Sequence, residues 1–212
     1  GSHPGRDLTL PPSTRPPRSL PCVTQLIEAY VSRKANPITD GLCREGLACC
    51  ARSLLRVVQE GNDVDARSDM SLASLLSGLA LANGGLGAVH GVAGPLGGWR
   101  NIPHGVACGR LLLPVIEANV RRLQSEAPAH TALQRFEEIA RILTGNPHAG
   151  LAAGMAWLDR LGRQLDIPPL ARFGLKESDL PGIAANALKA SSMKGNPIEL
   201  GKKDVIDILR HA

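Results

Sequence analysis

Apolar residues recur at helical spacing along most of the chain, and no stretch alternates apolar and polar residues as a half-buried strand would. Two stretches show the helical spacing i, i+3, i+4, i+7 in full: Leu72, Leu75, Leu76 and Leu79, and Phe136, Ile139, Ala140 and Leu143. The pattern predicts helices over residues 23–33, 38–59, 68–90, 104–123, 132–143, 149–164, 180–189 and 203–210. We therefore expect an all-α, multi-helix domain.

The length and composition fit one such domain. The chain has 212 residues, of which 43% are hydrophobic but only 2% aromatic. A chain of this length buries a sizeable core, and with so few aromatic residues that core must consist of Leu, Ala, Val and Ile. Small and aliphatic side chains favour close-packed helices.

The first 21 residues differ from the rest. Gly1–His3 is typical of the remnant of a cleaved expression tag. Residues 11–21 hold five prolines, which predict an extended lead-in because proline lacks a backbone donor. We expect a tag remnant and Pro/Arg-rich lead-in over 1–21, followed by an all-helical domain over 22–212.

Charge, hydropathy and cysteine usage exclude several classes of protein. The net charge of +5 is spread among acidic residues, and aromatic side chains for base stacking are scarce, so we expect no nucleic-acid partner. No apolar run is long enough to cross a bilayer, and we expect no membrane partner. The five cysteines form no paired motif. They predict a reduced, cytoplasmic protein.

The candidate chemistry lies in the glycine-rich segment from Gly84 to Ala107, which contains His90 and His104. His104 follows Pro103, which favours the first turn of a helix, whereas the run from Gly94 to Gly98 predicts the end of an earlier helix. Two helix ends would then face one cavity. Imidazole binds zinc, copper, iron and nickel, but two histidines supply only two ligands, so a pair of helix-capping histidines is the alternative.

This segment resembles the glycine- and histidine-rich signature of the iron-containing (group III) alcohol dehydrogenases. Residues 24–40 resemble the first helix of that family's metal-binding domain, and weaker similarity continues through 63–67, 70–83 and 196–197. The resemblance implies a C-terminal, dehydroquinate synthase-like helical domain that helps to transfer hydride between a small alcohol or aldehyde and NAD or NADP. We expect the chain to lack the family's nucleotide-binding domain, which would precede Leu8, and therefore to be inactive alone.

The resemblance also implies a divalent metal, Fe²⁺ or in some members Zn²⁺, bound by an aspartate and three histidines. His90 and His104 match two of these ligands. The family's Asp-Ala-Leu-Thr-His pattern aligns with residues 21–25, where Pro21 has no ligand atom and Gln25 offers only a neutral amide oxygen. Gly94 stands where many members have a further histidine. The predicted metal site, His90, His104 and Gln25, is therefore incomplete, and it binds iron weakly or stays empty.

One hypothesis concerns the origin of these departures. Residues 15–22 match nothing in the family although both flanks do, as a compensated reading-frame error in the gene would produce.

Other hypotheses concern the rest of the chain. Trp99 and Arg100 either line the substrate entrance or simply pack against the protein. We expect a homo-oligomer. The alternative function is a catalytically dead helical module for interaction or dimerisation.

Overall fold

The computed structural model describes residues 16–212, with side chains from Leu20 onward. The predicted tag remnant and the first part of the predicted lead-in lie outside this range. The described chain contains no strand, which confirms the all-α prediction. Its helices are α1 (Pro16–Val31), α2 (Pro37–Gln59), α3 (Val64–Gly84), α4 (Ala88–Arg100), α5 (His104–Glu126), α6 (Thr131–Thr144), α7 (Leu151–Gln164), α8 (Leu180–Ala187) and α9 (Lys202–His211), with 3₁₀ turns at Leu170–Phe173, Glu177–Asp179 and Ser191–Gly195.

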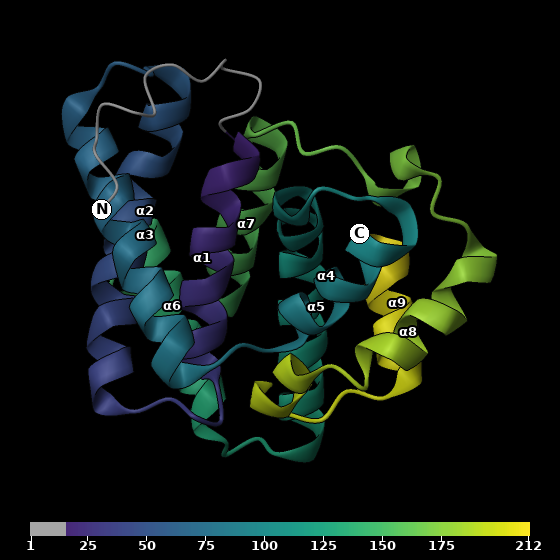
Figure 1. Cartoon of the computed structure of the whole chain (residues 1–212). Coiled ribbons are helices and arrows are strands. Elements are labelled where there is room, and N and C mark those ends of the chain that lie inside the picture. The colour runs from purple at the N-terminus through teal and green to yellow at the C-terminus, as the bar shows by residue number, and fades with distance from the viewer. Residues whose placement is uncertain (1–15) are drawn as a thin grey trace.

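Helix α1 lies at the centre of the molecule. It packs against α2 and α3 on one side and against α5 on the other, and it also contacts α6 (Figure 1). From Leu20 to Ser32 every residue of the helix is buried except Pro21 and Gln25, which are partly accessible. A helix that is apolar on nearly all sides belongs in a core, and here the accessible stripe is limited to those two positions.

The lead-in is partly helical, which corrects the expectation of an extended segment up to residue 21. Helix α1 begins at Pro16 and contains Pro21. Proline fits the first turn of a helix, where Pro16 and Pro17 lie, because the N–H that it lacks would have no partner there. Pro21 lies inside the helix, where it removes one backbone hydrogen bond. Leu20, which is 2% exposed, anchors the start of the helix in the core. Its Cδ1 lies 2.7 Å from where a Cβ on Gly109 of α5 would stand, so a larger residue at position 109 would displace the leucine side chain.

The helix expected over 68–90 is two helices. Helix α3 ends at Gly84, and Gly85 has φ +71°, a conformation that glycine adopts without strain. Helix α4 then begins at Ala88 and continues through Gly94–Gly98 to Arg100. The prediction that this glycine run ends a helix is wrong, because α4 continues through it to Arg100. The break between the two helices lies at Gly85, where the chain bends by 101° and the backbone has a positive φ.

Helix α3 buries its small residues instead of its leucines. Ala73, Ser77 and Ala80 are at most 2% exposed, whereas Leu75 is 61% exposed and Leu79 is 44% exposed. The small side chains let α3 approach α1 and α2 closely (Figure 1). The spacing of the leucines predicts the helix correctly, but the leucines form its outer face.

Candidate metal centre

The two histidines of the glycine-rich segment lie side by side at two helix starts. His90 is the third residue of α4 and His104 is the first residue of α5. Their ring centroids are 5.3 Å apart, with the ring planes tilted by 56°. The geometry is thus consistent with the prediction that both residues line one site. Both histidines lie at helix N-termini, whereas the sequence predicts the end of one helix and the start of another.

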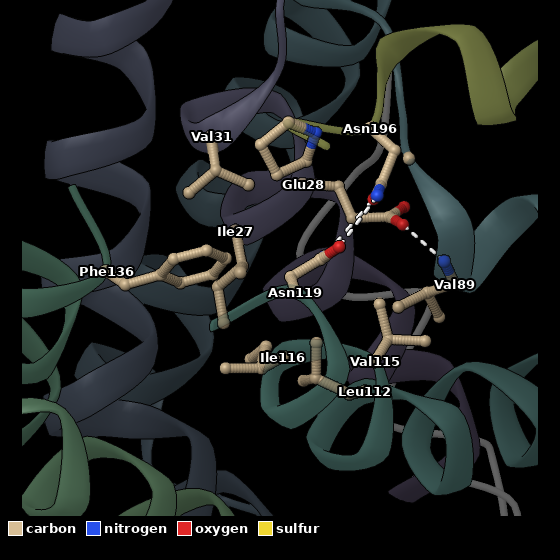
Figure 2. A pocket seen from close by; sticks show the side chains of 12 residues that line it. Ile27, Glu28, Val31, Val89, Leu112, Val115, Ile116, Asn119, Phe136 and Asn196 are labelled. Atoms are coloured by element: carbon tan, nitrogen blue, oxygen red, sulfur yellow. Dashed lines mark hydrogen bonds between the residues drawn. The ribbon is translucent and has the colours of Figure 1, made fainter. Parts of the chain in front are cut away.

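Glu28 of α1 holds the first of these rings in place. Its Oε2 lies 2.5 Å from His90 Nδ1, and its Oε1 accepts a hydrogen bond of 2.6 Å from the backbone N–H of Val89 (Figure 2). The side chains of Glu28 and His90 are only 5% and 8% exposed. A carboxylate accepts hydrogen bonds, so the proton resides on Nδ1 and the free lone pair of the neutral ring lies on Nε2.

A buried amide pair fixes the same helix start from the other side. Asn196 Oδ1 accepts a hydrogen bond of 3.2 Å from the N–H of Ala88, and Asn196 Nδ2 donates to Asn119 Oδ1 at 2.7 Å (Figure 2). Gly195 allows the approach, because a Cβ at this position would lie 2.1 Å from the carbonyl oxygen of Leu86. The first free N–H groups of α4 are therefore satisfied by side chains from α1 and from the C-terminal part of the chain.

A small, mostly apolar pocket adjoins this network on the core side. Its lining residues include Ile27, Leu112 and Phe136, and Glu28 and Asn196 contribute the polar edge (Figure 2). Apolar surroundings strengthen the electrostatic interactions of the buried carboxylate. Among its lining residues, Glu28 is the one ionisable group.

Cys108 completes a cluster of three donor atoms. It lies one helical turn after His104, and its Sγ is 3.4 Å from His104 Nε2 and 3.9 Å from His90 Nε2. The sulfur and one nitrogen of each ring all lie within 4.8 Å of one another. Burial raises the pKa of the Cys108 thiol to about 12, and partial burial together with neighbouring His90 lowers the pKa of His104. Both shifts favour the uncharged forms of Cys108 and His104.

The two positions on α1 that the resemblance links to metal binding bring no strong ligand. Pro21, Gln25 and Glu28 occupy positions i, i+4 and i+7, so they share one face of the helix. Gln25 is partly accessible and makes no hydrogen bond to another described residue. The predicted third ligand is therefore only a neutral amide on the correct helix face.

Trp99 and Arg100 belong to the last turn of α4 and not to a loop. The guanidinium of Arg100 forms an ion pair of 2.6 Å with Asp179, and the indole of Trp99 lies against Gly182, where a Cβ would be 2.9 Å away. Both contacts join α4 to the start of α8. This arrangement favours the packing interpretation of the two residues.

Sequence reasoning missed Glu28, Cys108 and Asn196 as members of the site. Glu28 and Asn196 come from positions far apart along the chain, and no local pattern links them to His90. A signal did exist for Cys108, since the spacing His104-x-x-x-Cys108 places both donors on one face of a helix.

No single helix of the described chain is long and apolar enough to span a membrane. The pair α3 and α4 passes a test of length and composition together, but a bend of 101° separates the two helices.

Comparisons with known proteins find related sequences over nearly the whole chain. The family model described as Fe-containing alcohol dehydrogenase family, C-terminal, matches residues 19–212. Alcohol dehydrogenase 4 of Saccharomyces cerevisiae is 36% identical over 205 residues, which cover 96% of this chain and 51% of the yeast protein. The 1,3-propanediol dehydrogenase of Klebsiella pneumoniae is 36% identical over 197 residues, covering 90% of this chain and 48% of that protein.

Solved structures show the same relationship. The crystal structure of a 1,3-propanediol oxidoreductase superposes with a TM-score of 0.88 at 33% identity, over 98% of this chain and 53% of that protein. The chain therefore spans about half the length of the relatives that it matches.

Proposed function

Because the chain belongs to the iron-containing alcohol dehydrogenase family and matches its C-terminal half, we propose that it provides the metal- and substrate-binding half of an NAD(P)-linked oxidoreductase. The substrate class is a small alcohol or aldehyde. The observation that carries this proposal is the pairing of His90 with His104 at the starts of α4 and α5, with His90 held by Glu28.

The ligand set of the family does not fit this chain. A hard or borderline ion such as Fe²⁺ favours an anionic oxygen ligand, but proline stands at the aspartate position and glutamine at a histidine position, Pro21 and Gln25. We therefore assign no reaction step to iron. His90 and His104 are the proposed ligands of a divalent ion, and Gln25 contributes at most a neutral oxygen.

The chain's own residues perform two tasks in this proposal. Glu28 fixes the tautomer and orientation of His90, as carboxylates do for metal-binding histidines. His104 is exposed, so its ring lies where solvent or a substrate oxygen can reach the site. The N-termini of α4 and α5 carry partial positive charge, which favours a developing negative charge on such an oxygen.

Hydride transfer requires a nicotinamide ring held within reach of the substrate carbon, and positioning contributes much of the rate. Residues 16–212 contain no strand and therefore no strand–turn–helix nucleotide fingerprint. We infer that the chain is inactive by itself and that the cofactor is bound by a separate nucleotide-binding half.

A chimera tests this proposal. The N-terminal half of the Klebsiella pneumoniae relative is joined to residues 19–212 of this chain, once with the native sequence and once with Pro21→Asp and Gln25→His. We expect NAD-dependent oxidation of propane-1,3-diol by the doubly substituted chimera loaded with Fe²⁺, little by the native chimera, and none by the chain alone. Turnover by the chain alone, or an inert but folded and ion-loaded substituted chimera, contradicts the proposal.

The second candidate is a catalytically dead module for interaction or dimerisation. The exposed leucines of α3, Leu72, Leu75 and Leu79, favour it, because apolar surface patches promote association. We propose a homo-oligomer on the same ground. Light scattering of the native chain and of Leu75→Glu tests this. A monomeric native chain removes the support for association, and an ion-binding native chain argues against a dead module.

The state of the cysteines supports a proposal for the cellular location, and the distribution of charge supports one for the partners. All five cysteines are free and buried, which supports a reducing, cytoplasmic location. The spread of positive charge gives no reason to propose a nucleic-acid partner, and we propose none; salt-sensitive binding to DNA or RNA in a titration contradicts this.

A further inference from the structure

We propose that Cys108 is the third protein ligand of the ion bound by His90 and His104, and that the site is consequently selective for a zinc-class ion. The inference rests on the proposed ion-binding function. It goes beyond that function, because it adds a ligand for which the resemblance gives no counterpart and changes the class of metal.

The distances fit a tetrahedral zinc site. Zinc binds sulfur at about 2.3 Å and imidazole nitrogen at about 2.0–2.1 Å, which places a sulfur and a nitrogen of the same tetrahedron about 3.6 Å apart. The corresponding distances from Cys108 Sγ are 3.4 Å to His104 Nε2 and 3.9 Å to His90 Nε2. An ion can therefore be bound with small movements of side chains.

The ligands are also oriented as a binding site requires. Glu28 holds Nδ1 of His90, so Nε2, the nitrogen that bears the free lone pair, is the one near the sulfur. Metal-binding histidines commonly donate their other N–H to a carboxylate in this way. His104 and Cys108 lie one turn apart on α5, which places both donors on one face of that helix.

The donor set selects the ion. Thiolate and imidazole are ligands that suit zinc, whereas carboxylate and water oxygens suit harder ions. On binding, the Cys108 thiol loses its proton to solvent, and the sulfur–metal bond replaces the sulfur–hydrogen bond. The thiolate thus supplies the negative charge that proline at position 21 cannot supply.

The site keeps one position open. Three protein ligands leave the fourth position of a tetrahedron free, as in catalytic zinc sites, while structural sites use four. His104 is exposed whereas Cys108 is buried, so the open position faces solvent on the side of His104. A water molecule or a substrate oxygen is the expected fourth ligand.

The environment of Cys108 differs from that of three other buried cysteines on the chain. Cys22 and Cys50 lie with their sulfur atoms 3.9 Å apart, and neither has a described contact with a histidine. Cys43 is fully buried on α2 and has no described hydrogen bond. Cys43→Ser is therefore a matched control for Cys108→Ser, since both replace a buried thiol by a hydroxyl.

The experiment is a titration of the chain with Co²⁺, a spectroscopic substitute for Zn²⁺, followed by competition with Zn²⁺ against a chromophoric chelator. For the native chain and Cys43→Ser we expect one ion per chain and the near-ultraviolet charge-transfer band of a thiolate–cobalt bond. For Cys108→Ser we expect loss of that band and a fall in Zn²⁺ affinity on the order of a hundredfold, since loss of a ligand has at least the effect of loss of its supporting contacts.

The outcomes separate the inference from the proposed function. Stoichiometric binding without a thiolate band, or with unchanged affinity in Cys108→Ser, overturns the role of Cys108 but leaves a histidine-bound ion. Absence of any ion binding by the native chain overturns both. X-ray absorption at the zinc edge of the native chain needs no variant, and it should show one sulfur at about 2.3 Å; a shell of nitrogen and oxygen alone contradicts the inference.

Discussion

The first turns of α4 and α5 differ in chemistry from the accessible stripe of α1, Pro21 and Gln25, which the resemblance assigns to the same site. The starts of α4 and α5 carry two imidazoles and, one turn further along α5, a thiol. The accessible stripe of α1 carries Pro21 and Gln25, neither of which supplies an anionic or strongly basic ligand. The donor atoms of this chain are therefore gathered on α4 and α5.

The same comparison separates the residue that supports the site from the two predicted ligand positions of α1. Glu28 lies on the same helix face as Pro21 and Gln25, yet it is buried and hydrogen-bonded to His90 and Val89. A buried carboxylate cannot be lost without leaving unpaired donors, whereas a partly accessible ligand position can change with little effect on folding. Stability and metal binding thus place separate demands on one helix.

The largest expected effect comes from restoring the ligands of α1. Pro21→Asp combined with Gln25→His adds a carboxylate and an imidazole to the accessible stripe. We expect Fe²⁺ affinity to rise on the order of a hundredfold, which corresponds to about 2.7 kcal/mol. Anaerobic titration measures it, with Gln25→Asn as the control that keeps a neutral amide. An unchanged affinity in the folded double variant would show that this face of α1 does not reach the ion.

Glu28→Ala should produce the next largest effect, now on stability. The substitution leaves the N–H groups of Val89 and His90 without their buried acceptor, and we expect a loss of about 2 kcal/mol in the free energy of unfolding. Glu117→Ala, at an exposed position of α5, is the control and should change stability by less than about 0.5 kcal/mol. Urea denaturation monitored by circular dichroism compares the two, and equal losses would contradict the supporting role of Glu28.

The sequence predicts much of this architecture because helices leave a local pattern. Spacing of apolar residues located most of the helices, and the pairing of His90 with His104 followed from the glycine-rich segment that contains them. The break at Gly85 was missed, because φ +71° at one glycine is not visible among several glycines. Glu28 and Asn196 were missed because they reach α4 from sites 61 and 108 residues away along the chain.

Substitution by alanine at two glycines of α4 should have different effects on stability. A Cβ on Gly98 meets nothing within 4 Å, and alanine at this exposed position should stabilise the helix by about 1 kcal/mol. A Cβ on Gly91 would lie 2.5 Å from Met193 Sδ, so alanine next to His90 should bring no such gain. Thermal unfolding of both variants measures the difference. A stabilised Gly91→Ala would mean that the start of α4 is packed less tightly than the structure shows.

The smallest expected effect concerns pH, at a site remote from the cluster. The guanidinium of Arg44, with the hydroxyl of Tyr30, lowers the pKa of Glu138. A lowered folded pKa gives stability that is present above the unfolded value of about 4.3 and is lost as pH falls through the folded value. Because the pair is partly exposed, Glu138→Gln should cost less than about 1 kcal/mol at pH 7 and nothing once the carboxyl is protonated. Denaturation midpoints from pH 7 to pH 3 measure this, and a constant difference between variant and native chain would contradict it.

Native mass spectrometry of zinc stoichiometry tests the central claim most directly, because it asks which helices hold the ion. The native chain and Gln25→Ala should each bind one Zn²⁺, and His90→Ala and His104→Ala should bind none at the same concentration. Loss of zinc in Gln25→Ala, or retention of zinc in both histidine variants, would contradict the claim that α4 and α5 carry the metal centre of this chain.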